Sequence, residues 1–185
     1  MRRLRLLVDV DEVLGDFQTP ALDIMAKVTG RRYQPEDFEV WDIFTVLDDE
    51  QKELVFAEIE KPGFCSNLKP LPGAVDAITY LRGLVDIFPV TSPFHSVPWV
   101  TERTKWLGDH FGWKKSEVVH TSAKFLVRGD AILDDKPDHI VAWTAEYPAG
   151  LGMLWHIPNT RTLGHDHLRV RSWGEVIERV KSIVR

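Results

Sequence analysis

The chain has 185 residues, of which 44% are hydrophobic and 28% charged, and it carries a net charge of −5. This length suffices for one domain with a sizeable buried core, with or without an inserted lobe. The acidic balance argues against a nucleic-acid polymer as partner, although local cations or a metal can still bind a small anion. The single cysteine, Cys65, excludes an intramolecular disulfide and fits a reducing compartment.

The N-terminus begins with two arginines and an apolar run over residues 4–8, an arrangement that superficially resembles a signal peptide. The run is too short for that role, and acids at positions 9, 11 and 12 interrupt it. No other segment of the sequence is long and apolar enough to cross a bilayer. We therefore expect a soluble, cytoplasmic protein that does not associate with membranes.

Residues 4–8 predict a buried strand, because a short apolar run bounded by polar residues is typical of parallel sheets. Asp9 and Asp11 follow directly, where parallel α/β sheets usually place their chemistry. A turn or a helix cap is the alternative interpretation of such a pair taken alone. The groups that follow the other strands distinguish the two interpretations.

Two helices are predicted next, and neither is followed by a convincing strand. Thr19 as cap and Pro20 at the first helical position indicate a helix that Gly30 ends. Acidic residues then open a second helix over about 48–60. Residues 17–70 therefore form a mostly helical insertion after the first strand.

Strands and helices alternate through the rest of the chain. The predicted strands are 86–90, 117–120, 131–133, 150–157 and 168–170, and the predicted helices are 73–83, 98–111, 137–147 and a terminal one opened by the capping box of Ser172 and Glu175. Pro89 makes the strand at 86–90 irregular, since proline cannot donate to a ladder. Repeated strand–helix units predict the α/β class with a doubly wound parallel sheet, whose core comprises residues 1–16 and 71–185.

Polar groups follow four of the predicted strands. They are Asp9 and Asp11, Thr91 and Ser92, Lys124 a little beyond its strand, and Asp134 with Asp135. Since the carboxyl ends of parallel strands open on one edge of a sheet, we expect these side chains to converge there. Capping or turn chemistry explains any one of these groups but explains the whole set poorly.

The expected set has a definite chemistry. Crowded carboxylates repel one another unless a cation lies between them, and oxygen ligands favour a hard ion such as Mg²⁺. A metal, a lysine and hydroxyl groups together provide charge and donors for a phosphate. One carboxylate can attack phosphorus while a second protonates the leaving alcohol and later activates water. Asp9 and Asp11 have the spacing for these two tasks.

With these motifs the chain resembles the haloacid dehalogenase-like phosphatase superfamily, and within it the 5′(3′)-deoxyribonucleotidase family. The similarity extends along most of the chain and is most specific over residues 124–137. The four superfamily motifs match, in order, Asp9-Val10-Asp11-Glu12-Val13, Thr91-Ser92, Lys124 and Asp134-Asp135. The resemblance implies a Rossmann-like core with a small helical cap, so we name residues 17–70 the cap segment.

The resemblance also implies roles for the matching residues. Asp9 would be the nucleophile and Asp11 the general acid and base. Thr91 or Ser92, together with Lys124, would hold the phosphoryl oxygens. An aspartate at position 11, where the ATPases of the superfamily have threonine, indicates a phosphatase.

The metal implied by the resemblance is Mg²⁺. The carboxylate of Asp9, the backbone carbonyl of Asp11 and the carboxylate of Asp134 would bind it, and Asp135 would support the site. Glu12 departs from the family pattern, because the relatives often have glycine there. An extra acid at this position bears on metal or leaving-group contacts.

Aromatic residues in or beside the cap segment are candidates for binding a nucleobase, as in the relatives. They are Phe17, Trp41, Phe44 and Phe64. Bases stack readily on aromatic rings. The alternative is that the rings only pack the small helical lobe.

Three further groups have less defined roles. Arg103 and His95 lie after Ser92 and could reach the phosphate, although a solvated helix face also explains Arg103. His165 and His167, with Asp166 between them, resemble a zinc motif. A fourth ligand is not evident and Gly164 indicates a loop, so we interpret this segment as a surface loop.

The sequence therefore predicts a Mg²⁺-dependent phosphatase that hydrolyses nucleoside monophosphates, specifically deoxyribonucleotides, through an aspartyl-phosphate intermediate. Two alternatives remain. One is a phosphatase of another small phosphate ester, because the cap segment alone sets the substrate. The other is a non-catalytic nucleotide- or phosphate-binding module, since fold does not grant function. The expected partner is a small phosphate monoester, and a homodimer is compatible with the sequence.

Overall fold

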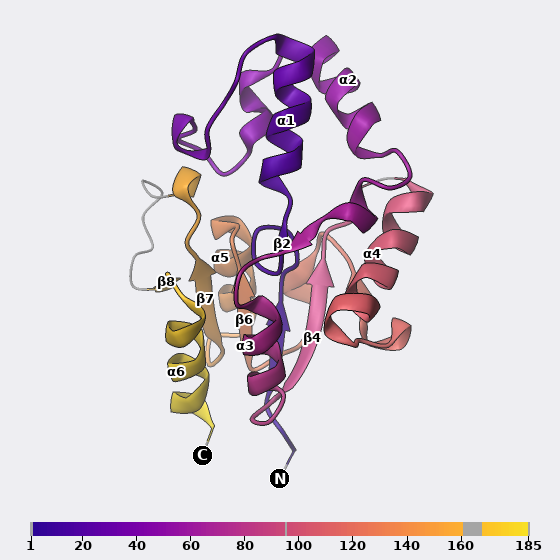
Figure 1. The fold of residues 1–185 in the computed structure, drawn as a ribbon. Coiled ribbons are helices and arrows are strands. Elements are labelled where there is room, and N and C mark those ends of the chain that lie inside the picture. Colours follow the sequence, from indigo (N-terminus) through magenta and orange to yellow (C-terminus); the bar gives the residue numbers. More distant parts are fainter. Residues whose placement is uncertain (1, 95, 161–167, 185) are drawn as a thin grey trace.

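The centre of the molecule is a six-stranded sheet in which all neighbouring strands are parallel (Figure 1). The computed structural model describes residues 2–94, 96–160 and 168–184. From one edge to the other, the strands are β5 (Val119–His120), β4 (Asp86–Thr91), β1 (Arg5–Val8), β6 (Ala131–Asp134), β7 (Leu151–Trp155) and β8 (Arg169–Val170).

The strand order shows a doubly wound sheet. After β1 the chain fills β4 and β5 on one side, and it then returns to fill β6, β7 and β8 on the other. The order therefore reverses between β1 and β6, and ligands of such sheets bind in the crevice at this reversal. Val8 pairs with Leu133 across the two strands, so the next residues, Asp9 and Asp134, emerge side by side. The predicted fold class is confirmed.

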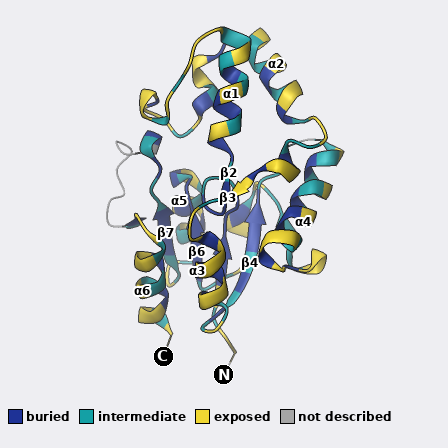
Figure 2. Cartoon of the chain, viewed as in Figure 1, coloured by how far each residue is buried: buried dark blue, intermediate teal, exposed yellow. Residues whose placement is uncertain are grey.

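Helices cover both faces of the sheet. On one face α3 (Ala74–Leu81) contacts α4 (Val97–Phe111) and α6 (Trp173–Ile183), and on the other α5 (Pro137–Glu146) packs on β6 and β7. Alternate strand residues divide accordingly: Leu6 and Leu133 join the larger core, and Leu7 and Ile132 join a smaller core under α5. Figure 2 shows the buried strands between helices whose outer faces are exposed.

The cap segment lies beyond the carboxyl-end edge of the sheet, opposite both termini (Figure 1). Its two helices, α1 (Gln18–Thr29) and α2 (Asp49–Ile59), contact each other. An antiparallel pair of two-residue strands, β2 (Gly15–Asp16) and β3 (Lys69–Pro70), joins the points where the chain enters and leaves this segment. The short 3₁₀ helices of the chain are η1 (Pro35–Asp37), η2 (Ile43–Val46), η3 (Cys65–Asn67), η4 (Lys115–Glu117), η5 (Lys124–Leu126) and η6 (Pro158–Thr160).

The predicted start of the first helix is wrong. Thr19 does not cap α1, which begins at Gln18, and the side chain of the preceding Phe17 offers no cap either. The Glu12 carboxylate instead accepts hydrogen bonds from the backbone N–H groups of Phe17 and Gln18, at 2.9 and 2.7 Å. The Asp16 carboxylate, one residue before Phe17, adds a local cap by accepting from the backbone N–H of Thr19 at 3.1 Å. The contribution of Glu12 leaves no local sequence signal, because capping patterns are defined by neighbouring positions.

Other predicted boundaries hold or shift slightly. Asp48 caps α2, and the hydroxyl of Ser172 accepts from the backbone of Glu175, as predicted. The strand predicted over 117–120 is shorter, since η4 extends to residue 117. Pro89 lies inside β4. The residues of β4 that pair with β5 are the two that follow Pro89. Within the described ranges, no helix has the length and apolar character needed to span a bilayer.

Candidate active site

A buried lysine joins two carboxylates at the reversal point of the sheet. Asp9 follows β1, and its backbone N–H still donates to Leu133 of β6, at 2.8 Å. The Lys124 ammonium, from η5, lies 2.6 Å from Asp9 Oδ1 and 2.7 Å from Asp134 Oδ2. Lys124 is 1% exposed and Asp134 is fully buried. Buried charges need such partners, because their desolvation is costly.

The buried aspartates at this point of the sheet differ in the direction in which their pKa values are shifted. Burial, reinforced by the neighbouring Asp134 carboxylate, raises the pKa of Asp9 to about 6, against the opposing influence of Lys124. Burial also acts on Asp134, but Lys124 and His139 outweigh it and bring the pKa of Asp134 to about 2. Burial and the charges of Asp9 and Asp134 raise the pKa of Asp135 well above its usual value. The site thus holds more negative charge than Lys124 alone balances.

Asp11 lies in a tight loop after Asp9 and is held by an arginine. The guanidinium Nη2 of Arg103, from α4, donates to Asp11 Oδ1 at 2.5 Å. Arg103 is fully buried, and its guanidinium lies over the rings of Trp99 and Trp106, 5.0 and 5.6 Å from their centroids. Arg103 therefore contacts a carboxylate inside the protein. The alternative that Arg103 lies on a solvated face of its helix is wrong.

The two hydroxyl residues at the carboxyl end of β4, Thr91 and Ser92, differ in their surroundings. Thr91 is fully buried, and its Oγ1 has no hydrogen-bond partner among the described residues. Ser92 lines the cavity described below, and its Oγ lies 3.5 Å from the carbonyl of Thr121. A buried hydroxyl without a partner is costly, so Thr91 has an unused donor at this edge of the sheet.

Asp135 connects the sheet edge to the cap segment. Trp41 donates its indole N–H to Asp135 Oδ2 at 2.7 Å, and Lys136 Nζ lies 4.4 Å from the centroid of the same ring. Asp135 Oδ1 is buried and lacks a partner within the part of the chain that the structure describes. Trp41 is thereby fixed beside Asp135 at the edge of the sheet.

A cavity of about 410 Å³ lies between this edge and the cap segment. Its floor carries acids and a hydroxyl: Asp9, Asp11, Glu12, Ser92 and Asp135. Its aromatic wall comprises Phe17, Trp41, Phe44, Phe56 and Phe94. Phe17 contacts both Phe44 and Phe94, at centroid separations of 6.3 and 5.8 Å. A polar floor under an apolar wall is typical of small-molecule sites.

The four aromatic residues predicted to bind a nucleobase do not all line the cavity. Phe17, Trp41 and Phe44 line the cavity. Phe64 packs behind Phe17, at 5.9 Å, and stacks on Trp99. Phe56 and Phe94 also belong to this wall, and no sequence motif marks them, because only the packing of separate elements brings them there.

A buried amide holds the cap segment onto the core and was also missed. Asn159, in η6, donates to the carbonyls of Val40 and Trp41, at 3.1 and 2.8 Å. It accepts from the side chain of Gln18 at 3.0 Å. No repeat or motif marks an isolated asparagine, so its role is visible only once the fold is known.

Glu12 has an unusual conformation. Its φ is 57°, in the left-handed region that favours glycine. The two hydrogen bonds to α1 offset the cost of this conformation. Burial raises the pKa of Glu12 to about 7, although the backbone N–H groups of Gln18 and Phe17 oppose the shift.

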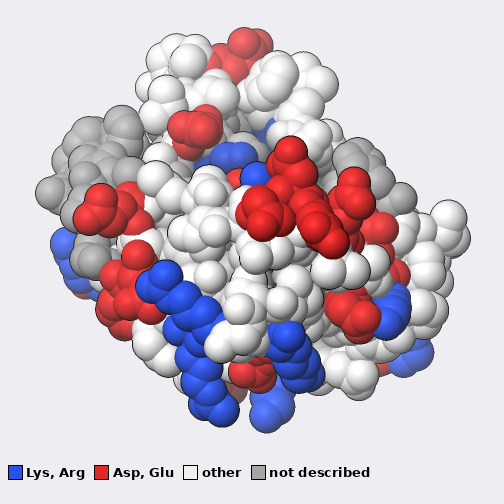
Figure 3. Space-filling view, turned by 90° about the horizontal axis from the view of Figure 1, so that it is seen from above, with Lys and Arg blue, Asp and Glu red and all other residues white. Residues whose placement is uncertain are grey.

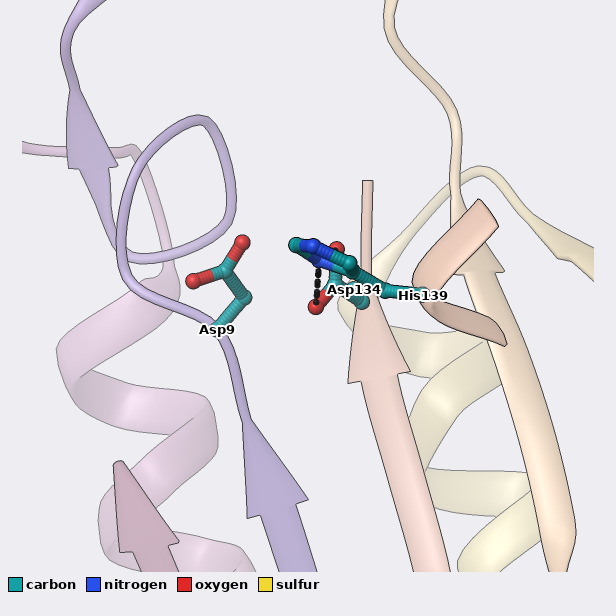
Figure 4. A group of neighbouring side chains, drawn as sticks. All are labelled: Asp9, Asp134 and His139. Carbon is teal, nitrogen blue, oxygen red and sulfur yellow. Dashed lines mark hydrogen bonds and ion pairs between the residues drawn. The ribbon is translucent and has the colours of Figure 1, made fainter. Parts of the chain in front are cut away.

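The donor set fits a divalent cation. Asp9, Asp134 and His139 each offer one ligand atom, and the three atoms lie within 4.8 Å of one another (Figure 4). Carboxylate oxygens suit hard cations, and the orphaned oxygen of Asp135 adds to the unbalanced charge. Seen from the side of the cap segment, the surface also shows a gathering of Asp and Glu side chains (Figure 3). Such a field attracts cations.

Some residues named from the sequence lie outside the described residues. These are His95 and the segment of His165, Asp166 and His167. The nearby His156 lies within the described residues, and its Nδ1 is 3.4 Å from the guanidinium of Arg169.

Comparison with known proteins identifies the family. The family model "5′ nucleotidase, deoxy (Pyrimidine), cytosolic type C protein" matches residues 2–184. A human relative, "5′(3′)-deoxyribonucleotidase, cytosolic type", is 33% identical over 151 residues, which cover 73% of this chain and 72% of the relative. The chain belongs to the 5′(3′)-deoxyribonucleotidase family. It is therefore a phosphoric monoester hydrolase of the 5′-nucleotidase type.

Solved structures show that this deoxyribonucleotidase family member has the haloacid dehalogenase-like fold. A haloacid dehalogenase-like hydrolase from Streptococcus pneumoniae superposes with a TM-score of 0.68 at 10% identity, covering 96% of this chain and 98% of that one. YfnB from Bacillus subtilis, in a structure bound to magnesium, gives a TM-score of 0.56 at 15% identity, covering 97% and 99%. The resemblance drawn from the motifs is thus confirmed.

Proposed function

We propose that the protein hydrolyses deoxyribonucleoside monophosphates in a Mg²⁺-dependent reaction through an aspartyl-phosphate intermediate at Asp9. The observation that carries this proposal is the position of Asp9, which lies beside the Lys124 ammonium on the floor of a cavity with an aromatic wall. A phosphate bound to this floor leaves the rest of the substrate against the rings.

The first step is attack by Asp9 on phosphorus. Among the described contacts, Val10 N–H and Lys124 both bind Oδ1 of Asp9, at 2.7 and 2.6 Å, which leaves Oδ2 for the attack. A bond forms between Oδ2 and phosphorus while the bond from phosphorus to the ester oxygen breaks. Asp11 gives a proton to that oxygen, and the nucleoside leaves as an alcohol.

The second step restores the enzyme. Water attacks the phosphorus of the aspartyl phosphate, and Asp11, now a carboxylate, accepts the proton. The bond from phosphorus to Oδ2 breaks, so inorganic phosphate and the Asp9 carboxylate are formed. Arg103 holds Asp11 in place for both proton transfers, since its buried guanidinium donates to Oδ1 at 2.5 Å and leaves Oδ2 to carry the proton.

The remaining polar groups hold the phosphoryl oxygens and the metal. Lys124, the unused hydroxyl of Thr91 and the Ser92 hydroxyl donate to the phosphoryl group. Mg²⁺ would be held by Asp9, the backbone carbonyl of Asp11 and Asp134, with Asp135 in support. When bound, the ion would supply positive charge that stabilises the negative charge on the phosphoryl oxygens.

The cap segment, residues 17–70, supplies the specificity. We propose that Phe17, Trp41 and Phe44 bind the nucleobase by stacking, because a base presents a flat aromatic face to these rings. Phe64 supports Phe17 from behind. The cytosolic type of the human relative supports a cytoplasmic location for this chain.

Phosphate release from a panel of nucleoside monophosphates and sugar phosphates, with and without Mg²⁺, tests the proposal. We expect metal-dependent release that favours the deoxyribonucleotides and vanishes in Asp9→Asn. Equal turnover by Asp9→Asn would contradict covalent catalysis. A preference for sugar phosphates would instead support the alternative that the protein hydrolyses another phosphate ester.

A further inference from the structure

A histidine lies against the carboxylates at the reversal point of the sheet. His139 comes from the first turn of α5, which begins at Pro137, three residues after Asp134. Its Nδ1 lies 3.2 and 3.1 Å from the two carboxylate oxygens of Asp134. Figure 4 shows the ring extending from α5 across Asp134 toward Asp9.

The neighbours of Asp134 restrict where a cation could bind. Lys136 N–H donates to Asp134 Oδ1 at 2.9 Å, and Lys124 lies 2.7 Å from Oδ2. Asp134 is thus anchored by the backbone on one side and by a lysine on the other. The histidine lies at a third side, and it forms part of the cavity lining, so it is accessible to an ion that enters the cavity.

We propose that His139 is a nitrogen ligand of the bound metal and that it raises the affinity of the site for Mn²⁺ and Co²⁺ relative to Mg²⁺. The inference deepens the proposed function and rests on it, because both place a divalent ion at Asp9 and Asp134. The ligand atoms of all three residues lie within 4.8 Å of one another, so they are close enough to share one ion.

The selectivity follows from the ligand chemistry. Imidazole suits transition metals, whereas Mg²⁺ prefers oxygen ligands and retains its waters. Affinity at a given mixed nitrogen and oxygen site rises from Mn²⁺ to Co²⁺. A histidine that only oriented Asp134 through its hydrogen bond would change the affinity for all three ions in parallel.

Metal titration of the full chain distinguishes these roles. MgCl₂, MnCl₂ and CoCl₂ alone are titrated calorimetrically into the wild-type protein and into His139→Gln, with circular dichroism as a check of folding. We expect His139→Gln to weaken Co²⁺ and Mn²⁺ binding by roughly tenfold or more, in the range seen for metal-site substitutions. Mg²⁺ binding should change far less. His110→Gln, at an exposed position in the last turn of α4, is the matched control and should leave all three titrations unchanged.

Electron spin echo measurements on bound Mn²⁺ provide a readout independent of affinity. We expect nitrogen modulation in the wild-type protein and its loss in His139→Gln. Parallel weakening of all three ions, or no nitrogen modulation in the wild type, would overturn the inference and leave the Mg²⁺ phosphatase intact. Failure of every ion to bind the wild-type protein would instead overturn the metal site on which the proposed function depends.

Discussion

The floor and the wall of the cavity are built in opposite ways. Every charged group on the floor lies at or near the end of a strand, and its position is fixed by backbone pairing and by ion pairs such as that of Lys124 with Asp9. The aromatic wall draws on the start of α1, the middle of α2, η2 and the segment after β4, held by ring contacts such as that of Phe44 with Phe56. The contrast shows that the topology of the sheet positions the floor, whereas the wall depends on side-chain packing between separate elements.

The largest expected effect comes from removing the lysine side chain that lies beside the floor carboxylate Asp9. Lys124→Met leaves Asp9 and Asp134 as buried carboxylates without their partner. Breaking a buried ion pair costs about 3–5 kcal/mol, so we expect a loss of that order in metal-free urea denaturation. Turnover should fall about 10³-fold, since a donor to the phosphoryl group is lost. Lys115→Met, at an exposed position in η4, should change neither quantity.

Arg103 tests whether the floor acts through position as well as charge. Arg103→Met frees Asp11, and the expected loss in kcat/KM for a nucleoside monophosphate is about 10²-fold, the lower range for a general acid. The loss for p-nitrophenyl phosphate should be under about 3-fold, because its leaving group needs no proton. Arg103→Lys should recover part of the activity. Equal losses for both substrates would contradict a positioning role through Asp11.

Glu12 lies where floor and wall meet, and it makes folding depend on pH. Its pKa rises from 4.5 in the unfolded chain to about 7 in the folded protein. Between these two pKa values, Glu12 binds more protons in the folded state than in the unfolded state. The free energy of unfolding therefore falls as the pH rises from the lower to the higher pKa, and the full decrease is present above the higher one. Glu12→Gln removes this effect while Oε1 can still cap α1. We expect Glu12→Gln to gain about 2 kcal/mol relative to wild type between pH 5 and pH 8 in metal-free denaturation. A constant difference across this range would contradict burial of the charge.

The wall gives a matched pair of phenylalanines. Phe44 lines the cavity and Phe64 does not, yet both contact Phe17. Phe44→Leu should raise the KM of a nucleoside monophosphate about tenfold with kcat nearly unchanged, since stacking contributes about 1–3 kcal/mol per base. Phe64→Leu should lower stability and leave KM near the wild-type value. The same KM for both variants would show that the wall only packs the lobe.

The floor was predictable from the sequence because its signals are local. A buried run that ends in Asp9, and another that ends in Asp134, are readable one strand at a time, and parallel topology then brings the ends together. The part of the α1 cap that Glu12 supplies was not predictable, since Glu12 reaches the helix from outside it. Phe94 and Asn159 were missed for a related reason: their neighbours are distant in the chain, and only tertiary packing defines them.

The β2–β3 pair has a consequence for how such proteins diversify. Gly15 is paired with Pro70 and Asp16 with Lys69, so the chain enters and leaves the cap segment at one hydrogen-bonded point. Lengthening or exchanging the residues between these strands alters loop-closure entropy only slowly and leaves the strand order of the sheet intact. Recombination can therefore replace the cap segment with a different one while the sheet and the floor of the cavity stay the same.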